Sequence, residues 1–170
     1  MKEFIIKKGK HKTSRFYFDL TFKKNIKFQA KFDESCLYDL GNNDNYDINK
    51  LYGFSTTYFH QKQSGRVGWR CIDGKNIQLL TYSYNDSNRD LNDSEVLGEV
   101  KPNELFECEI IDNEDHYLYK FFKLNKKCEL ISSAIDTKQK DWFLFHYKLR
   151  PYFGGNNPAP HDMKIWIKIL

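Results

Sequence analysis

The sequence predicts an all-β fold, an antiparallel β-sandwich of jelly-roll type with about a dozen short strands. Its composition is typical of a sheet protein, because the 170 residues include 14 Phe and 11 Tyr, whereas alanine occurs only at Ala30, Ala134 and Ala159. Apolar and polar residues alternate through most of the chain, and clusters of Gly, Asn, Asp and Pro separate the alternating segments. This pattern favours a sandwich over a βαβ fold.

Four segments alternate most regularly and are expected to be strands: 15–22, 26–32, 104–110 and 163–170. In the first, the residues expected on the buried face are Phe16, Phe18, Leu20 and Phe22. Less regular strand candidates are 2–7, 51–60, 65–72, 76–84, 94–101, 115–124, 127–134 and 142–150. Short helical turns are expected only at 49–51 and 137–142.

The connections indicate a single domain over residues 1–170. Asp73-Gly74 lies between two apolar runs and suits a tight hairpin turn, in which both central residues have positive φ. Two longer loops are expected at 33–50 and 151–162. The sequence contains no repeat, low-complexity tail or interdomain linker.

Charge is unevenly distributed along the chain. Residues 1–31 contain ten Lys or Arg against Glu3 and Asp19, whereas residues 86–115 contain eleven acids against two basic residues. Residues 1–14 are therefore expected to be either a basic arm that meets an acidic partner or an edge strand whose lysines discourage aggregation. Only five of the 27 basic residues are Arg, so no sequence-specific nucleic-acid binding is expected.

The four cysteines are expected to be free thiols in a reducing compartment. They show no Cys-x-x-Cys spacing, and Cys71 and Cys108 are in phase with apolar neighbours, which indicates burial. No apolar run is long enough to span a membrane, and no signal-peptide core follows Met1. We expect a soluble, cytoplasmic protein, or a virion component if the chain is phage-encoded, with oligomerisation left open.

No reaction motif predicts catalytic residues, a metal or a cofactor. A Gly-x-Ser-x-Gly turn and a phosphate-binding Gly-rich loop are absent, and the five histidines are never spaced i, i+2 or i, i+4. Glu107 and Glu109 are spaced like a glycosidase pair, but surface glutamates of a regular strand are the simpler interpretation. The oxygen-rich loops 41–47 and 85–90 suit either calcium or ordinary turns.

Two segments could bind a ligand. In 65–71, Arg66, Gly68 and Arg70 share the face opposite Val67 and Trp69, and the glycine is expected to leave a flat gap between two guanidiniums. Such a face suits a carboxylate, phosphate or sugar, and the alternative is cross-strand ion pairing with acids. His60 precedes this segment.

The second segment is the rim loop 151–162, which contains three prolines and two glycines. It contributes Tyr152 and His161, and it forms either a structural corner or one wall of a binding site. His161-Asp162 could also be a hydrogen-bonded pair that orients the loop.

Four segments carry a resemblance to known proteins: Ser35–Gly41, Asp47–Ser55, Arg66–Arg70 and Pro151–Asp162. These segments resemble an uncharacterised family of small all-β proteins of bacteria and their large phages. The resemblance covers most of the chain and implies no assigned activity. Tyr152–Gly155 is also similar to the closing strand of jelly-roll polysaccharide lyases, but their Arg-x-Glu and Gln-x-His motifs are absent, so only the sandwich architecture is implied.

We therefore expect a non-catalytic β-sandwich that either recognises a glycan or acts as a structural component of a larger assembly such as a phage virion, with a glycan or protein partner. The alternative is a glycan-active hydrolase or lyase. The side chains expected to line the ligand site are His60, Arg66, Arg70, Tyr152 and His161.

Overall fold

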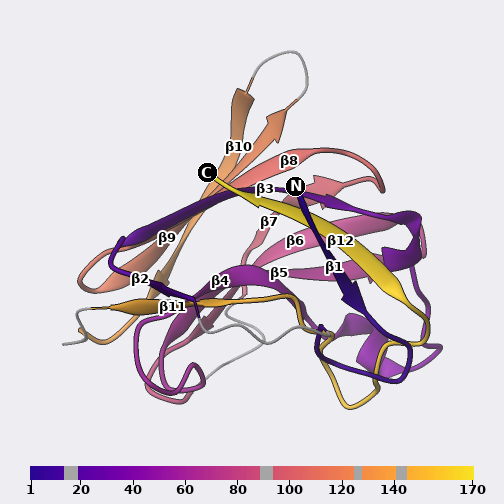
Figure 1. Ribbon diagram of the computed structural model, residues 1–170, viewed down its shortest axis with the longest axis horizontal. Coiled ribbons are helices and arrows are strands. Elements are labelled where there is room, and N and C mark those ends of the chain that lie inside the picture. The colour runs from indigo at the N-terminus through magenta and orange to yellow at the C-terminus, as the bar shows by residue number, and fades with distance from the viewer. Residues whose placement is uncertain (14–18, 89–93, 125–127, 141–144) are drawn as a thin grey trace.

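The computed structural model describes residues 1–13, 19–88, 94–124, 128–140 and 145–170. Over these residues the chain forms twelve β-strands and two short 3-10 helices. The strands make two antiparallel six-stranded sheets that pack face to face as a sandwich (Figure 1). The predicted all-β jelly-roll class is confirmed.

Sheet A and sheet B each combine strands from both halves of the chain. Sheet A has the order β1 (Lys2–Ile6), β12 (Met163–Ile169), β3 (Asn25–Phe32), β8 (Phe106–Asp112), β9 (His116–Leu124) and β10 (Cys128–Thr137). Sheet B has the order β2 (Leu20–Thr21), β11 (His146–Leu149), β4 (Asn49–Ser55), β5 (Ser64–Ile72), β6 (Asn76–Tyr84) and β7 (Val96–Val100).

The winding of the chain is that of a jelly roll. β12 lies between β1 and β3 in sheet A, and β11 lies between β2 and β4 in sheet B. The first four strands thus alternate between the sheets, and the last two strands return beside them. This arrangement joins distant parts of the sequence without parallel pairing.

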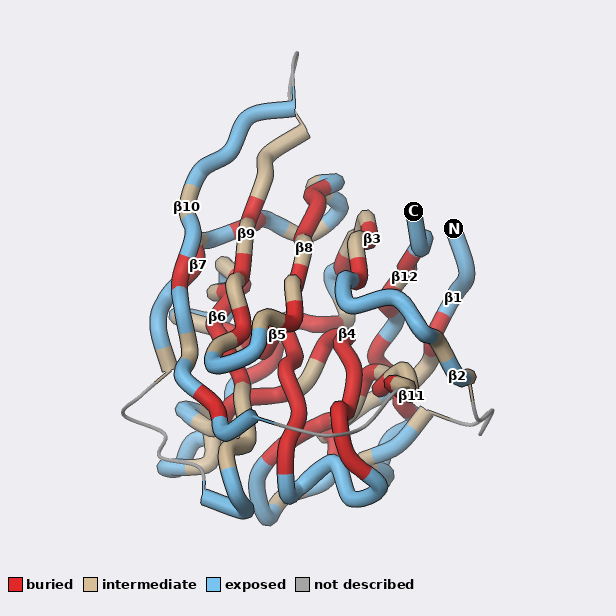
Figure 2. Tube along the Cα trace, turned by 90° about the vertical axis from the view of Figure 1, so that its left-hand side faces the viewer, coloured by how far each residue is buried: buried red, intermediate tan, exposed pale blue. Residues whose placement is uncertain are grey.

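Alternation along the strands builds the core between the sheets. Every second residue of β3 is buried, and in Figure 2 the buried segments of the two sheets face each other. Trp69 of β5 is fully buried, and its ring centroid lies 5.0 Å from that of Phe32 in sheet A. Cys71 and Cys108 are buried as predicted, and neither forms a disulfide. Contacts between aromatic rings therefore join the two sheets.

The first strand, β1, lies at an edge of sheet A. β1 pairs with β12, and its Phe4 and Ile6 belong to the core. The Lys7 ammonium lies 2.7 Å from the Asp162 carboxylate, and the Lys8 amide donates to the same carboxylate. Asp162 is thus paired with Lys7 and not with its neighbour His161, which contacts the Ser35 carbonyl instead.

Three local predictions are wrong. Asn49–Leu51 is not a helical turn but the start of β4, because its backbone pairs with β5. The 3-10 helices Glu34–Cys36 and Asn43–Tyr46 lie instead in the long loop 33–50. Leu20 and Phe22, expected on a buried face, are exposed, because the two-residue strand β2 lies at the edge of sheet B and pairs there with β11. The expected positions Phe16 and Phe18 lie outside the described residues, as do residues 141–144 of the segments 137–142 and 142–150.

Candidate functional site

The outer face of sheet B carries the predicted arginines. Val67 and Trp69 of β5 point into the core, so Arg66, Gly68 and Arg70 point outward, as the alternation predicts. Directly paired residues of an antiparallel sheet share a face. The register therefore places Tyr82 beside Arg66 on the outer face.

The expected flat gap at Gly68 is filled. A Cβ atom at this glycine would lie 2.4 Å from Cγ2 of Ile48, and Ile48 packs with Leu80 and Tyr82 in a small outer cluster. Gly68 thus makes room for Ile48 and leaves no space for a ligand between the two arginines.

Arg66 lies across its neighbouring strand. Its Cγ is 3.0 Å from the position that a Cβ of Gly53 would occupy, and its Nη2 donates to the carbonyl of Arg150. The Arg66 side chain is buried, and its Nε has no hydrogen-bond partner among the described residues. Burial lowers the pKa of Arg66 to about 10. The structure therefore holds a positive charge just beneath the outer surface.

Lys50 lies between two tyrosine rings beside Arg66. Its Nζ is 4.8 Å from the ring centroid of Tyr82 and 5.2 Å from that of Tyr152. Tyr152 reaches this position because its backbone pairs with Lys50 on one side and with Lys12 on the other. The rim loop thus extends sheet B and places a tyrosine on the outer face.

His60 lies in the electrostatic field of this group. Its pKa is lowered by partial burial and then by the positive charges of Arg66, Lys12 and Lys50. The charged groups that act on His60 are thus Arg66, Lys12 and Lys50, and all three are positive. We call this set of residues the basic tyrosine face: Lys12, Lys50, His60, Arg66, Tyr82 and Tyr152.

Tyr152 and Tyr82, the cross-strand neighbour of Arg66, both lie against Lys50, and His60 lies in the connection from β4 to β5. The other two predicted residues have different partners. Arg70 donates from Nε to the Gln78 side chain over 2.9 Å and from Nη1 to the Tyr46 carbonyl. Its cross-strand partner is therefore an amide, where the alternative interpretation expected an acid. Nε2 of His161 lies 2.8 Å from the carbonyl of Ser35, so His161 fixes the rim loop to the first 3-10 helix.

Sequence reasoning missed Lys50, Tyr82 and Lys12. Tyr82 and Tyr84 are spaced i, i+2, and this spacing could have indicated an aromatic outer face on the strand that follows the Asp73-Gly74 turn. Lys50 and Lys12 gain their positions through long-range pairing with Tyr152. No local pattern in the sequence indicates such pairing.

The other candidate chemistries have structural roles among the described residues. Glu107 pairs with Lys27 over 2.8 Å and Glu109 with Lys120 over 3.5 Å, and Glu107 is buried, so it is not the solvated surface glutamate that the strand pattern predicted. Asp44, in one of the oxygen-rich loops, accepts hydrogen bonds from the backbone and side chain of Asn157. No group of three or more His, Cys, Asp or Glu within the described ranges could hold a metal ion.

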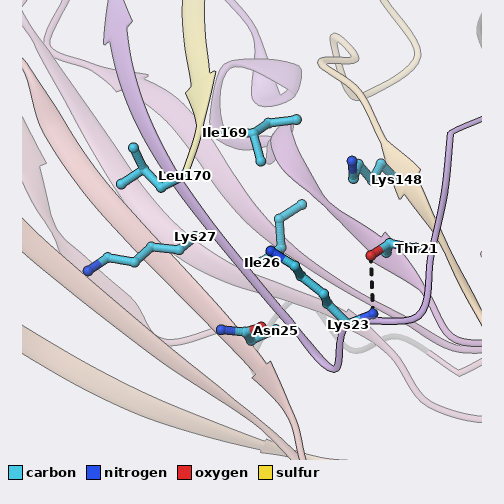
Figure 3. Close-up of a pocket in the computed structure, with 8 residues that line it drawn as sticks. All are labelled: Thr21, Lys23, Asn25, Ile26, Lys27, Lys148, Ile169 and Leu170. Atoms are coloured by element: carbon cyan, nitrogen blue, oxygen red, sulfur yellow. Dashed lines mark hydrogen bonds between the residues drawn. The ribbon is translucent and has the colours of Figure 1, made fainter.

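A small cavity also opens at one end of the sandwich, between β2, β3 and the C-terminal residues (Figure 3). Two of its three lysines already have acidic partners, because Lys27 pairs with Glu107 and Lys148 with Asp19. In Figure 3 the Lys27 side chain extends away from Thr21 and Lys148. These lysines therefore do not converge on an anion.

The comparisons with known proteins give structural likeness only. No family model matches the chain, and no curated protein matches it. An alginate lyase from Alteromonas sp. 272 superposes with a TM-score of 0.44 and 8% identity, covering 99% of this chain and 78% of the lyase. A polysaccharide lyase family 18 structure, aly-SJ02, gives a TM-score of 0.46 and 7% identity over 99% of this chain and 88% of that one.

The CBM2 module of the evolved Dit of Lactobacillus casei BL23 phage J-1 gives a TM-score of 0.41 and 8% identity, covering 98% of this chain and 74% of that chain. These scores and identities are too low to assign a function. Within the described residues, no helix is long and apolar enough to cross a membrane.

Proposed function

We propose that this protein binds an acidic glycan on the basic tyrosine face and does not transform it. One observation carries the proposal: the Lys50 ammonium is held between the rings of Tyr82 and Tyr152, beside the buried charge of Arg66. Tyr82 is buried and His11 stacks on the Tyr152 ring, so the exposed part of Tyr152 beside this charge is the aromatic surface that a charged sugar would meet.

Tyrosine suits the apolar part of a sugar ring. Its ring offers a flat apolar surface and its hydroxyl offers a hydrogen bond, so it binds ligands that are apolar on one side and polar on the other. Tyr152 is half-buried and paired through its backbone on both sides, so its ring is positioned before a ligand arrives. This preorganisation reduces the entropy lost on binding.

The positive potential selects an acidic ligand. Lys12 is exposed, and Lys50 is only partly buried, so both ammonium groups are near solvent. The buried Arg66 adds a charge that surrounding protein screens less than water would. A carboxylate on the sugar is the anion that forms charge-assisted hydrogen bonds with such donors.

The test compares oligogalacturonate with its methyl ester, which keeps the sugar and removes the charge. Isothermal titration calorimetry should detect binding of the acid, weakening with added salt, and little binding of the ester. Lys50→Met should weaken binding by about 10- to 100-fold, the equivalent of one charge-assisted hydrogen bond.

The matched control is Lys31→Met. Lys31 also lies over an aromatic ring, 4.7 Å from the centroid of Trp166, but on the outer face of sheet A. The Lys31→Met variant should bind oligogalacturonate as tightly as the unchanged protein does. Equal binding of acid and ester, or equal losses in the two variants, would refute the proposal.

A second candidate function is β-elimination in the same uronate. The lowered pKa of His60 keeps its imidazole neutral at neutral pH, so it could accept a proton from the sugar carbon beside the carboxylate. The glycosidic C–O bond would break as a carbon–carbon double bond forms, and the Tyr152 hydroxyl would protonate the leaving oxygen. Unsaturated product, detected by ultraviolet absorbance and lost in His60→Ala, would establish this function over simple binding.

A further inference from the structure

A buried cluster outside this face joins three chemically reactive side chains. Asp112 ends β8, Lys138 follows β10, and His146 begins β11 in the opposite sheet. The Lys138 Nζ lies 2.9 Å from Oδ1 of Asp112, and Nε2 of His146 lies 2.7 Å from its Oδ2. The side chains of Lys138, Asp112 and His146 are 2%, 5% and 3% exposed.

Backbone hydrogen bonds anchor two members of this cluster, and aromatic rings pack against it. The Asp112 amide donates to the Lys24 carbonyl over 2.7 Å, and the Lys138 amide donates to the Asp115 carbonyl over 2.8 Å. The Lys138 ammonium lies 5.3 Å from the centroid of the Tyr117 ring. The imidazole of His146 packs edge-on against Phe54 with centroids 5.0 Å apart. Both reacting groups are thus held in one place away from water.

The contact between Lys138 and Asp112 is close, but it lacks the geometry of a good ion pair. The Lys138 Nζ lies 2.9 Å from Oδ1 of Asp112, but the angles of this contact are not those of a hydrogen bond, and Oδ1 accepts none from the described residues. Nδ1 of the buried His146 likewise has no partner among the described residues. The free-energy cost of removing two charges from water is offset only when their geometry is good and their remaining lone pairs accept hydrogen bonds. This arrangement is therefore a poor ion pair and a close approach of a nucleophile to a carboxyl group.

We propose that Lys138 and Asp112 condense to form an intramolecular isopeptide bond. A proton passes from the ammonium to the carboxylate, giving an amine and a carboxylic acid, the forms that an apolar site favours. The lone pair of Nζ attacks Cγ of Asp112, so the Nζ–Cγ bond forms. The Cγ–Oδ2 bond then breaks, and Oδ2 leaves as water with two of the three ammonium protons. The third proton stays on the amide nitrogen, so atoms and charge balance without a co-reactant.

His146 is the proton carrier for this step. Its Nε2 contacts Oδ2, the oxygen that leaves, so it can pass on the proton that the attacking nitrogen releases. The imidazole ends in the protonation state in which it began. Fixed proximity supplies much of the acceleration, because two groups held in contact react as if at very high concentration.

The bond would link the end of β8 covalently to the segment after β10. Both strands belong to sheet A, and β9 and β10 project beyond the other strands at the top of Figure 1. A covalent link across their base would close a loop that includes this whole hairpin. The bond would therefore resist unfolding, by limiting the freedom of the unfolded chain.

Intact-mass spectrometry of the purified full chain tests the proposal directly. The expected mass is lower than that of the sequence by one water molecule, and a digest should yield one cross-linked peptide that contains both Asp112 and Lys138. A full mass for the folded protein would overturn the proposal, and this readout needs no variant.

Two variants sharpen the test. Lys138→Arg keeps the charge and should show the full mass, whereas a dehydrated Lys138→Arg would place the water loss elsewhere, for example at Asp73-Gly74, and overturn the proposal. His146→Gln should form the bond more slowly, so that freshly prepared protein contains a larger fraction at full mass. If His146→Gln forms the bond as fast as the unchanged protein, the role given to His146 is wrong. If Lys138→Arg fails to fold, the presence or absence of the cross-linked peptide in the unchanged protein decides whether the bond forms.

Discussion

The Arg66→Met variant tests whether the buried charge of Arg66 contributes to ligand binding or to the stability of the fold. Met retains much of the volume of the Arg66 stem over Gly53, and it removes the buried guanidinium. The backbone carbonyl of Arg150 loses its donor. The substitution therefore changes two opposing contributions to the free energy of unfolding.

Both contributions can be sized from the structure. Burial lowers the pKa of Arg66 from 12.5 to about 10, which makes the charged form about 3 kcal/mol less favourable than in water. Loss of a hydrogen bond to a charged donor costs about 1.5–3 kcal/mol. The two nearly cancel, so the free energy of unfolding of Arg66→Met should change by less than about 1.5 kcal/mol.

Urea unfolding measures this change, with an unaltered m-value as the sign that the folded state is intact. In the same preparation, the affinity for oligogalacturonate should fall about tenfold, because a charge beneath the surface is lost. A destabilisation above about 3 kcal/mol would show that Arg66 is a structural residue and refute this reasoning. Unchanged affinity would refute it equally.

Three further predictions concern the sandwich that presents this face. Gly53→Ala should destabilise the protein by more than about 2 kcal/mol, because the new Cβ would lie 2.2 Å from the Gly65 carbonyl oxygen, and urea unfolding would show it. Ile6→Ala should cost about 2–5 kcal/mol in the same assay, because Ile6 is fully buried. Burial raises the pKa values of Tyr38 and Tyr52 to about 12, so each keeps its proton in the folded state while the unfolded chain ionises near pH 10. Stability contributed by these tyrosines should be complete below pH 10 and fall by about 1.4 kcal/mol per tyrosine at about pH 11, as unfolding at several pH values would measure.

Controls for these predictions lie in the same chain. Gly74→Ala meets no atom within 4 Å but has a φ of 61°, so it should cost only about 1 kcal/mol. Ile5→Ala changes the neighbouring, partly exposed residue of β1 and should cost less than Ile6→Ala. In Tyr38→Phe the stability loss between pH 10 and 12 should shrink. Equal losses in the free energy of unfolding for the two glycine variants, or for the two isoleucine variants, would contradict the account. A pH dependence of stability that Tyr38→Phe leaves unchanged would contradict it as well.

Local alternation made much of sheet A predictable. The segments expected at 26–32 and 163–170 are β3 and β12, shifted by one residue at an end, and the expected segment 104–110 overlaps β8. In β3, and in β12 as far as Ile167, one face is buried and the other is exposed or partly exposed, so the pattern of side chains follows the pleat. In β8 the polar face also contains a buried residue, Glu107. Asp73 and Gly74 both have positive φ, as the hairpin turn requires.

The irregular segments depend on contacts that the sequence pattern does not reveal. The two 3-10 helices begin after Asp33 and Asn42, whose side chains accept from the amide two residues ahead. This capping pattern was a usable signal, Asp-x-Ser and Asn-x-Asp, within a stretch expected to be a loop. Residues 49–51 were expected to form a helical turn. They form a strand because β5 and Tyr152 pair with them.

The candidate site was predictable only where a single strand builds it. Arg66 follows from the alternation of β5, but its path over Gly53 depends on a glycine in a neighbouring strand. Lys50 joins the site because the rim loop returns from the far end of the sequence to place Tyr152 beside it. Pairing over such a separation is set by the jelly-roll winding, which only the whole fold defines.

Chemical-shift mapping tests the central claim most directly. Isotope-labelled protein titrated with oligogalacturonate should show its largest amide shifts around Lys50, His60, Arg66 and Tyr152, and the methyl ester at the same concentration should leave these signals in place. Shifts gathered instead on the outer face of sheet A around Lys31 and Trp166, or equal shifts with acid and ester, would contradict the assignment of acidic-glycan binding to the basic tyrosine face.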